Sequence, residues 1–171
     1  MHVAMTGVVL FALWRWADLP RWRRYHASML YFSASNLFYL YLCRDVPLWT
    51  LVADRSVPHP AATTAIYNFF IYPACVLLFL SRAPRRRSAA LWLHVAKWVA
   101  LFFVLEALYL KLGLMIHDNG WSLGWSLLFD CIMFPMLLLH SRRPLLAYAL
   151  SALNVIGWLL LFDVPSRSRF L

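Results

Sequence analysis

The sequence predicts an all-α fold, a six-helix integral membrane bundle, from its composition, its apolar runs and its aromatic content. Of the 171 residues, 63% are hydrophobic and 13% are charged, whereas soluble domains are nearer half apolar and about a quarter charged. Short polar loops separate six apolar runs, most of them near the ~20 residues that cross a bilayer. The nine Trp, eight Tyr and twelve Phe suit the aromatic belts of membrane–water interfaces.

The six runs predict one transmembrane domain, residues 1–171. The first run is short for a span, and we expect a short span in which Arg15 and Trp16 snorkel rather than a re-entrant segment. Pro73 in the third run and Pro135 in the fifth should kink their helices, because proline lacks the amide that bonds to residue i−4. Pro144 opens the sixth run. The helices are expected at about 2–16, 26–43, 61–81, 89–112, 121–140 and 144–162.

The net charge of +9 comes mainly from arginines in alternate loops. Loops one, three and five are arginine-rich and loops two and four are not, which is the positive-inside pattern and not a nucleic-acid-binding face. We therefore expect the odd-numbered loops in the cytoplasm of a bacterium, with both termini outside if the first run spans. These loops hold Arg15, Arg21, Arg23, Arg24, Arg82, Arg85, Arg86, Arg87, Arg142 and Arg143.

The third loop is the most basic. Arg82, Arg85, Arg86 and Arg87 would attract anionic lipid headgroups at the cytoplasmic face, although plain topogenic charge explains them equally well. The expected partners are thus the lipid bilayer, with anionic lipid at this loop, and a small ligand or cation inside the bundle. No nucleic-acid partner is expected, and oligomerisation stays open.

One polar residue in each run from the second to the sixth lies at a similar depth. Counted from the outer end of each helix at about 1.5 Å per residue, all five lie roughly 9–14 Å below the surface. An ionised carboxylate there costs about 2.5–3.5 kcal/mol unless it is solvated or paired, so convergence would lower these costs together. Ser126 shares a helical face with the carboxylate of the fifth run. The five are Asn36, Asn68, Glu106, Asp130 and Asn154.

This polar layer has two main interpretations. Either the side chains only join helices through hydrogen bonds, or they line a ligand or ion site. Glu106 and Asp130 favour a site, because two carboxylates in apolar surroundings suit proton exchange or cation binding. The predicted ligand-binding residues are the five of the layer together with Ser126.

Metal and cofactor signals are weak. His26, His94 and His140 lie near the cytoplasmic ends of their helices, where structural or lipid contacts explain them better than metal or haem ligation. The three cysteines form no CxxC and are expected to be free thiols. No Ser/His/Asp arrangement, P-loop or dinucleotide-binding motif is present, so we assign no catalytic residue and no cofactor.

An internal repeat is visible. SNLFYLYLC aligns with LEALYLKLG, which pairs Asn36 with Glu106. IYPACVLLFLSRAP resembles MFPMLLLHSRRP, which pairs Pro73 with Pro135. Helices two and three would then form an earlier copy of helices four and five, related by an axis along the membrane normal. Low-complexity apolar sequence also produces such matches, so a true duplication stays one of two explanations.

Two segments resemble a known family. NGWSLGWSLLFDCIMFPMLLLHSRRPLLAY is similar to the C-terminal signature, and WRRYHASMLYFSASNLFYLYLCRDVPLW to the N-terminal block, of a family of small multi-pass membrane proteins from spore-forming Gram-positive bacteria. Together they cover about a third of the chain. The resemblance implies the same multi-helix topology, but it carries no activity over to this chain.

The sequence therefore predicts a multi-pass protein of a bacterial cytoplasmic membrane. The leading function is binding or transport of an ion or small ligand in an outer-half pocket lined by Glu106 and Asp130. A non-catalytic assembly or packing subunit of a larger membrane complex is the alternative. An intramembrane enzyme that uses the two carboxylates as acid and base comes third.

Overall fold

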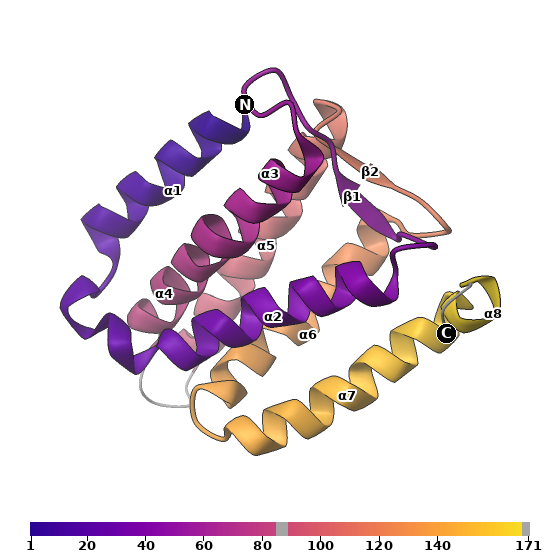
Figure 1. The fold of residues 1–171 in the computed structure, drawn as a ribbon. Coiled ribbons are helices and arrows are strands. Elements are labelled where there is room, and N and C mark those ends of the chain that lie inside the picture. Colours follow the sequence, from indigo (N-terminus) through magenta and orange to yellow (C-terminus); the bar gives the residue numbers. More distant parts are fainter. Residues whose placement is uncertain (85–88, 169–171) are drawn as a thin grey trace.

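The computed structural model describes residues 1–84 and 89–168, and its fold confirms the all-α prediction (Figure 1). A π-helical turn, η2 (Tyr67–Ile71), joins α3 to α4, and a 3-10 helix, η1 (Leu19–Arg24), precedes α2. Arg85, Arg86 and Arg87, expected to contact anionic lipid, lie outside the described residues. The α-helices are α1 (His2–Trp16), α2 (His26–Leu42), α3 (Pro60–Ile66), α4 (Tyr72–Arg82), α5 (Ala89–Lys111), α6 (Leu123–His140), α7 (Pro144–Leu161) and α8 (Val164–Arg167); the strands are β1 (Trp49–Leu51) and β2 (Met115–His117).

Within the described ranges, four helical segments are long and apolar enough to cross a membrane. They are Pro60–Arg82, which combines α3, η2 and α4, and the helices α5, α6 and α7. This supports a membrane location. Six spans are not confirmed, because α1 has 15 residues and α2 has 17. At about 1.5 Å per residue, α1 is only roughly 22 Å long, against ~30 Å of hydrocarbon.

Alternate loops lie at opposite ends of the bundle (Figure 1). At one end, which we call the arginine end, Arg82 Nε donates a 2.6 Å hydrogen bond to Trp16 O. Ser28 Oγ, near the start of α2, lies there 3.0 Å from His140 Nδ1, at the end of α6. At the other end, the strand end, β1 and β2 meet beside the N-terminus. The loops thus separate as the positive-inside pattern requires, and the side of the membrane that each end faces stays a prediction.

The strand end ties the second loop to the fourth. β1 and β2 pair antiparallel, with Thr50 opposite Ile116. Val52 N donates to Leu114 O over 2.8 Å and continues the ladder by one bond. The Asn119 side chain donates to Pro47 O over 2.7 Å. These bonds satisfy backbone groups of two loops with each other and hold the loops over one end of the bundle.

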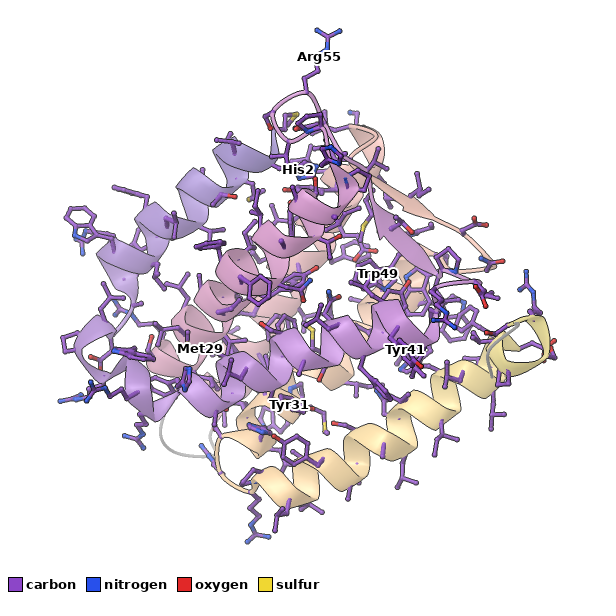
Figure 2. The ribbon with its side chains drawn as sticks, in the orientation of Figure 1. His2, Met29, Tyr31, Tyr41, Trp49 and Arg55 are labelled. Atoms are coloured by element: carbon purple, nitrogen blue, oxygen red, sulfur yellow. The ribbon has the colours of Figure 1, made fainter. Side chains whose placement is uncertain are left out.

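Helix α1 is held at the strand end by polar contacts of its first residues, Met1 and His2. The Asp54 carboxylate pairs with the Met1 amino group and accepts a hydrogen bond of 3.1 Å from His2 N. The His2 ring is fully buried, with Nε2 2.8 Å from Val52 O and Nδ1 3.0 Å from the Tyr67 hydroxyl. Figure 2 shows His2 beside the loop from which Arg55 projects.

The main apolar core lies between α4, α5 and α6, around Phe79 and Phe134. Helix α7 packs against α6 and leaves most of its surface uncovered. Leu145, Leu153 and Leu160 on α7 are 83%, 66% and 67% exposed. An apolar surface of this extent on a monomer marks a face for lipid or for another chain.

The two prolines have different local surroundings. The π-helical turn ends two residues before Pro73, and Tyr72 N bonds there to Tyr67 O, one residue further back than in an α-helix. Pro135 lies inside α6, which remains α-helical from Leu123 to His140. A π-helical turn like the one before Pro73 is therefore absent from α6, and the kinks expected at the two prolines stay a prediction.

Candidate functional site

A cavity of about 310 Å³ lies between α2, α5, α6 and α7, and β1 borders it at the strand end. Its volume is at the lower end of the ~300–1,000 Å³ of small-molecule sites. Asn68 does not line it. The other predicted residues do: Asn36, Glu106, Ser126, Asp130 and Asn154.

Glu106 is the most extensively bonded carboxylate of the cavity. Its Oε1 accepts a hydrogen bond of 2.6 Å from His117 Nε2 and another from Ser126 Oγ. Trp121 Nε1 in turn donates to Ser126 Oγ over 2.8 Å. Helix α5 supplies the carboxylate, β2 the imidazole and α6 the hydroxyl. The acceptor capacity of Glu106 on this oxygen is thus met by the protein itself.

Asp130 differs from Glu106 in having an oxygen without a partner. It is 4% exposed, and Oδ2 is buried with no hydrogen-bond partner in the described part of the chain. Trp158 Nε1, on α7, is buried without an acceptor in the same way, and Trp158 also lines the cavity. Leaving such a group unpaired costs about 1–3 kcal/mol, and more for a charge. The two side chains are therefore an unused acceptor and an unused donor in one cavity.

Asn36 and Asn68 form a pair of their own. Asn36 Nδ2 donates to Asn68 Oδ1 over 3.1 Å, and Asn68 Nδ2 donates to Thr64 O over 2.9 Å. Ser33 Oγ also donates to the backbone oxygen of Asn68 over 2.6 Å. Asn68 is 1% exposed and lies behind Asn36 as seen from the cavity. This pair joins α2 to η2, as the helix-joining interpretation expects.

The three candidate metal-binding histidines have separate environments. His26 is exposed beside Trp22, with ring centres 5.2 Å apart. His94 Nε2 lies 3.0 Å from Phe79 O. His140 is buried and stacks on Tyr31 at 4.1 Å. No group of three His, Cys, Asp or Glu side chains in residues 1–84 and 89–168 is placed to hold a metal ion.

Three residues of the site were not identified from the sequence. His117 lies in a loop strand, and only the strand pairing brings it onto Glu106. The Tyr39 hydroxyl accepts from Trp49 N over 2.8 Å and donates to Trp49 O over 2.8 Å, so it fixes the cavity wall at β1. The sequence does not distinguish Trp158 from the other aromatic residues expected at the membrane interface.

The predicted repeat relates the two polar pairs. It matches Asn36 to Glu106, and its second alignment, continued toward the N-terminus, places Asn68 opposite Asp130. Asn36 and Asn68 bond each other, whereas Glu106 bonds Ser126 and leaves Asp130 beside the cavity. Each half also has the order helix, strand, helix, and the strands pair. A duplication accounts for this order, and it stays a prediction.

Comparisons of this chain with protein-family models, with curated proteins and with solved structures find no match.

Proposed function

We propose that the chain is a multi-pass protein of a bacterial cytoplasmic membrane that binds a small ligand in the cavity beside Asp130, for storage, sensing or transport. In this proposal the arginine end faces the cytoplasm, so that the cavity and the strand end belong to the outer half. The resemblance to small membrane proteins of spore-forming bacteria is compatible with this location.

The observation that carries the proposal is the buried, unpaired oxygen of Asp130. A carboxylate inside a membrane bundle is costly, and it is normally paired or placed beside water or a substrate. Within the described residues the fold supplies hydrogen bonds to Glu106 but none to Asp130 Oδ2. An unpaired buried carboxyl group lowers the stability of the empty protein, and a ligand-binding role for Asp130 would explain why that cost is tolerated.

An assembly subunit is the second candidate. The exposed leucines of α7 favour it, because a partner chain could cover them instead of lipid. In that case the extracted protein should remain with a second chain, and substitution of Asp130 should not affect the association. Mass measurement of the complex extracted in mild detergent separates this candidate from a monomeric binding protein.

The test of binding uses Asp130→Asn and Asp130→Leu, with Asp118→Asn, a change at an exposed carboxylate, as the control. Small molecules extracted from the purified proteins are compared by mass spectrometry. We expect one species to be enriched with the wild type and the control and lost from both Asp130 variants. After removal of ligand, Asp130→Leu should melt at or above the wild-type temperature, because it removes an unpaired buried oxygen.

The opposite result has a clear meaning. Equal small-molecule content in all four proteins, together with a lower melting temperature for Asp130→Leu, would show that the carboxylate holds the helices together. The polar layer would then be structural, and the binding proposal would be wrong.

A further inference from the structure

We infer that the ligand of this cavity is an organic cation with an apolar body, which enters from the lipid between α2 and α7. The inference rests on the proposed binding function and names the class of ligand. It follows from the charge of the cavity, from its walls and from the place where it opens.

The cavity is lined by acidic side chains and not by basic ones. Its only charged lining residues in the described chain are Glu106 and Asp130, and no Lys or Arg lines it. Lys97 and Lys111, the two lysines of α5, are exposed and outside the cavity. His117 approaches from β2 but is bonded to Glu106. When Asp130 is ionised, the matching positive charge therefore has to come from the ligand.

The walls of the cavity are mostly aromatic and aliphatic. Cations are attracted to the faces of aromatic rings, by about 0.5–2 kcal/mol each, with the larger value where water is excluded. An apolar body would bury its surface on the same walls. The lining aromatic residues include Tyr39, Trp49, Tyr72, Phe102, Phe129 and Trp158.

A bare metal ion fits the cavity less well than an organic cation. Ca²⁺ takes six to eight oxygen ligands, and Mg²⁺ takes near-octahedral oxygen. The described residues provide no cluster of three metal-ligating side chains. Glu106 Oε1 is already bonded to two donors, whereas Asp130 Oδ2 is buried with no partner in the described residues. One carboxylate in an aromatic cavity recognises an ammonium group on a larger molecule better than a hydrated ion.

We place the opening between α2 and α7, because residues of both helices line the cavity. Toward the arginine end the two helices are joined by the hydroxyls of Tyr31 and Ser151, 2.5 Å apart. Toward the strand end, Cys43 and Phe162 belong to one apolar cluster. Between these contacts Phe38 lines the cavity and is still 51% exposed. In a membrane this surface would face lipid, so a ligand that partitions into the bilayer can reach Asp130.

The test uses two probes of the same shape. Benzyltrimethylammonium carries a permanent charge, and neopentylbenzene is its neutral isostere. Their affinities for the full-length protein in nanodiscs are measured by competition and by quenching of tryptophan fluorescence. We expect the wild type to prefer the cation by about tenfold or more, which is about 1.4 kcal/mol. Asp130→Asn should remove the preference, and Asp118→Asn should keep it.

Contrary results separate this inference from the proposed function. Equal binding of the two probes, unchanged by Asp130→Asn, would show a cavity for neutral molecules and overturn the cation inference alone. Tighter binding of phenylmethanesulfonate, an anion of similar size, would also overturn it. Absence of cation binding up to millimolar concentration would overturn it as well, while the proposed function is judged separately by the co-purified molecule.

Discussion

The side-chain amide of Asn36 donates a hydrogen bond of 3.1 Å to the side-chain oxygen of Asn68. The two residues lie on α2 and η2, and Asn68 is 1% exposed. A buried amide without a partner costs more than the bond itself contributes. A structural hydrogen bond between two helical segments therefore explains the presence of Asn36 and Asn68 in the polar layer without any ligand.

The Asn36–Asn68 bond predicts a coupled loss of stability. Asn68→Ala should lower the free energy of unfolding by about 1–3 kcal/mol, because it removes the acceptor of Asn36 and the donor to Thr64 O. Asn36→Ala should cost less, and the double variant should cost less than the sum. Unfolding by denaturant in detergent measures all three. Strict additivity would show that the two side chains do not interact.

The hydrogen bonds of the Tyr39 hydroxyl predict that removing this one oxygen atom lowers the stability of the protein strongly. Its hydroxyl accepts from Leu48 N at 3.0 Å and Trp49 N at 2.8 Å, and donates to Trp49 O at 2.8 Å. Tyr39→Phe should lower stability by about 1–3 kcal/mol, because two partly buried backbone amides and a carbonyl lose their partner. The control is Tyr41→Phe on the same helix, whose side chain is 62% exposed. Equal melting temperatures for the two variants would contradict this.

Asp54 predicts a dependence of stability on pH. The pKa of its carboxyl group lies well below the usual range, because the Met1 amino group, Ser56, His2 N and Val57 N donate hydrogen bonds to the carboxylate. A lowered folded-state pKa stabilises the protein above the unfolded pKa of about 3.9 and less as the pH falls below it. Asp54→Asn should therefore melt below the wild type near pH 7, and the difference should shrink toward pH ~3. A difference that grows on acidification would reverse the sign of this argument.

The positions of the loops predict an accessibility pattern. Arg55 and Ser141 are both exposed and lie at opposite ends of the bundle. In a background without the native cysteines, a membrane-impermeant thiol reagent added to intact cells should label Arg55→Cys and spare Ser141→Cys. Permeabilised cells provide the control, because both positions should then react. The reverse pattern would place the arginine end outside.

Much of the helical fold is readable from the sequence, because apolar runs between charged loops define helices inside a membrane. The expected run 144–162 compares with α7 at Pro144–Leu161, and 26–43 with α2 at His26–Leu42. The pairing of β1 with β2 was not readable, because three-residue strands in loops carry no periodic signal. Neither was the π-helical turn before Pro73.

Five of the six residues predicted to bind a ligand line one cavity, and their role in binding stays a prediction. Depth along each helix identified Glu106 and Asp130, and both line the cavity. The sequence does not show that Glu106, and not Asp130, is hydrogen-bonded to His117. The pairing of β1 with β2 places His117 beside Glu106. Depth also included Asn68, which lies behind Asn36 because rotation about the helix axis is not fixed by depth. Long-range contacts of this kind are outside what a one-dimensional pattern contains.

The π-helical turn has a consequence for the length of the third span. One residue of an α-helix corresponds to about 100° of rotation, and a π turn accommodates one inserted residue. If Tyr67–Ile71 were wound as regular α-helix with the same number of residues, the outer segment, Pro60–Ile66, would be turned by about that angle relative to α4. Thr63, now fully buried, would leave its place in the bundle. In the segment between the second loop and Pro73, the number of residues therefore sets which side chains face the bundle, as much as the identity of those residues does.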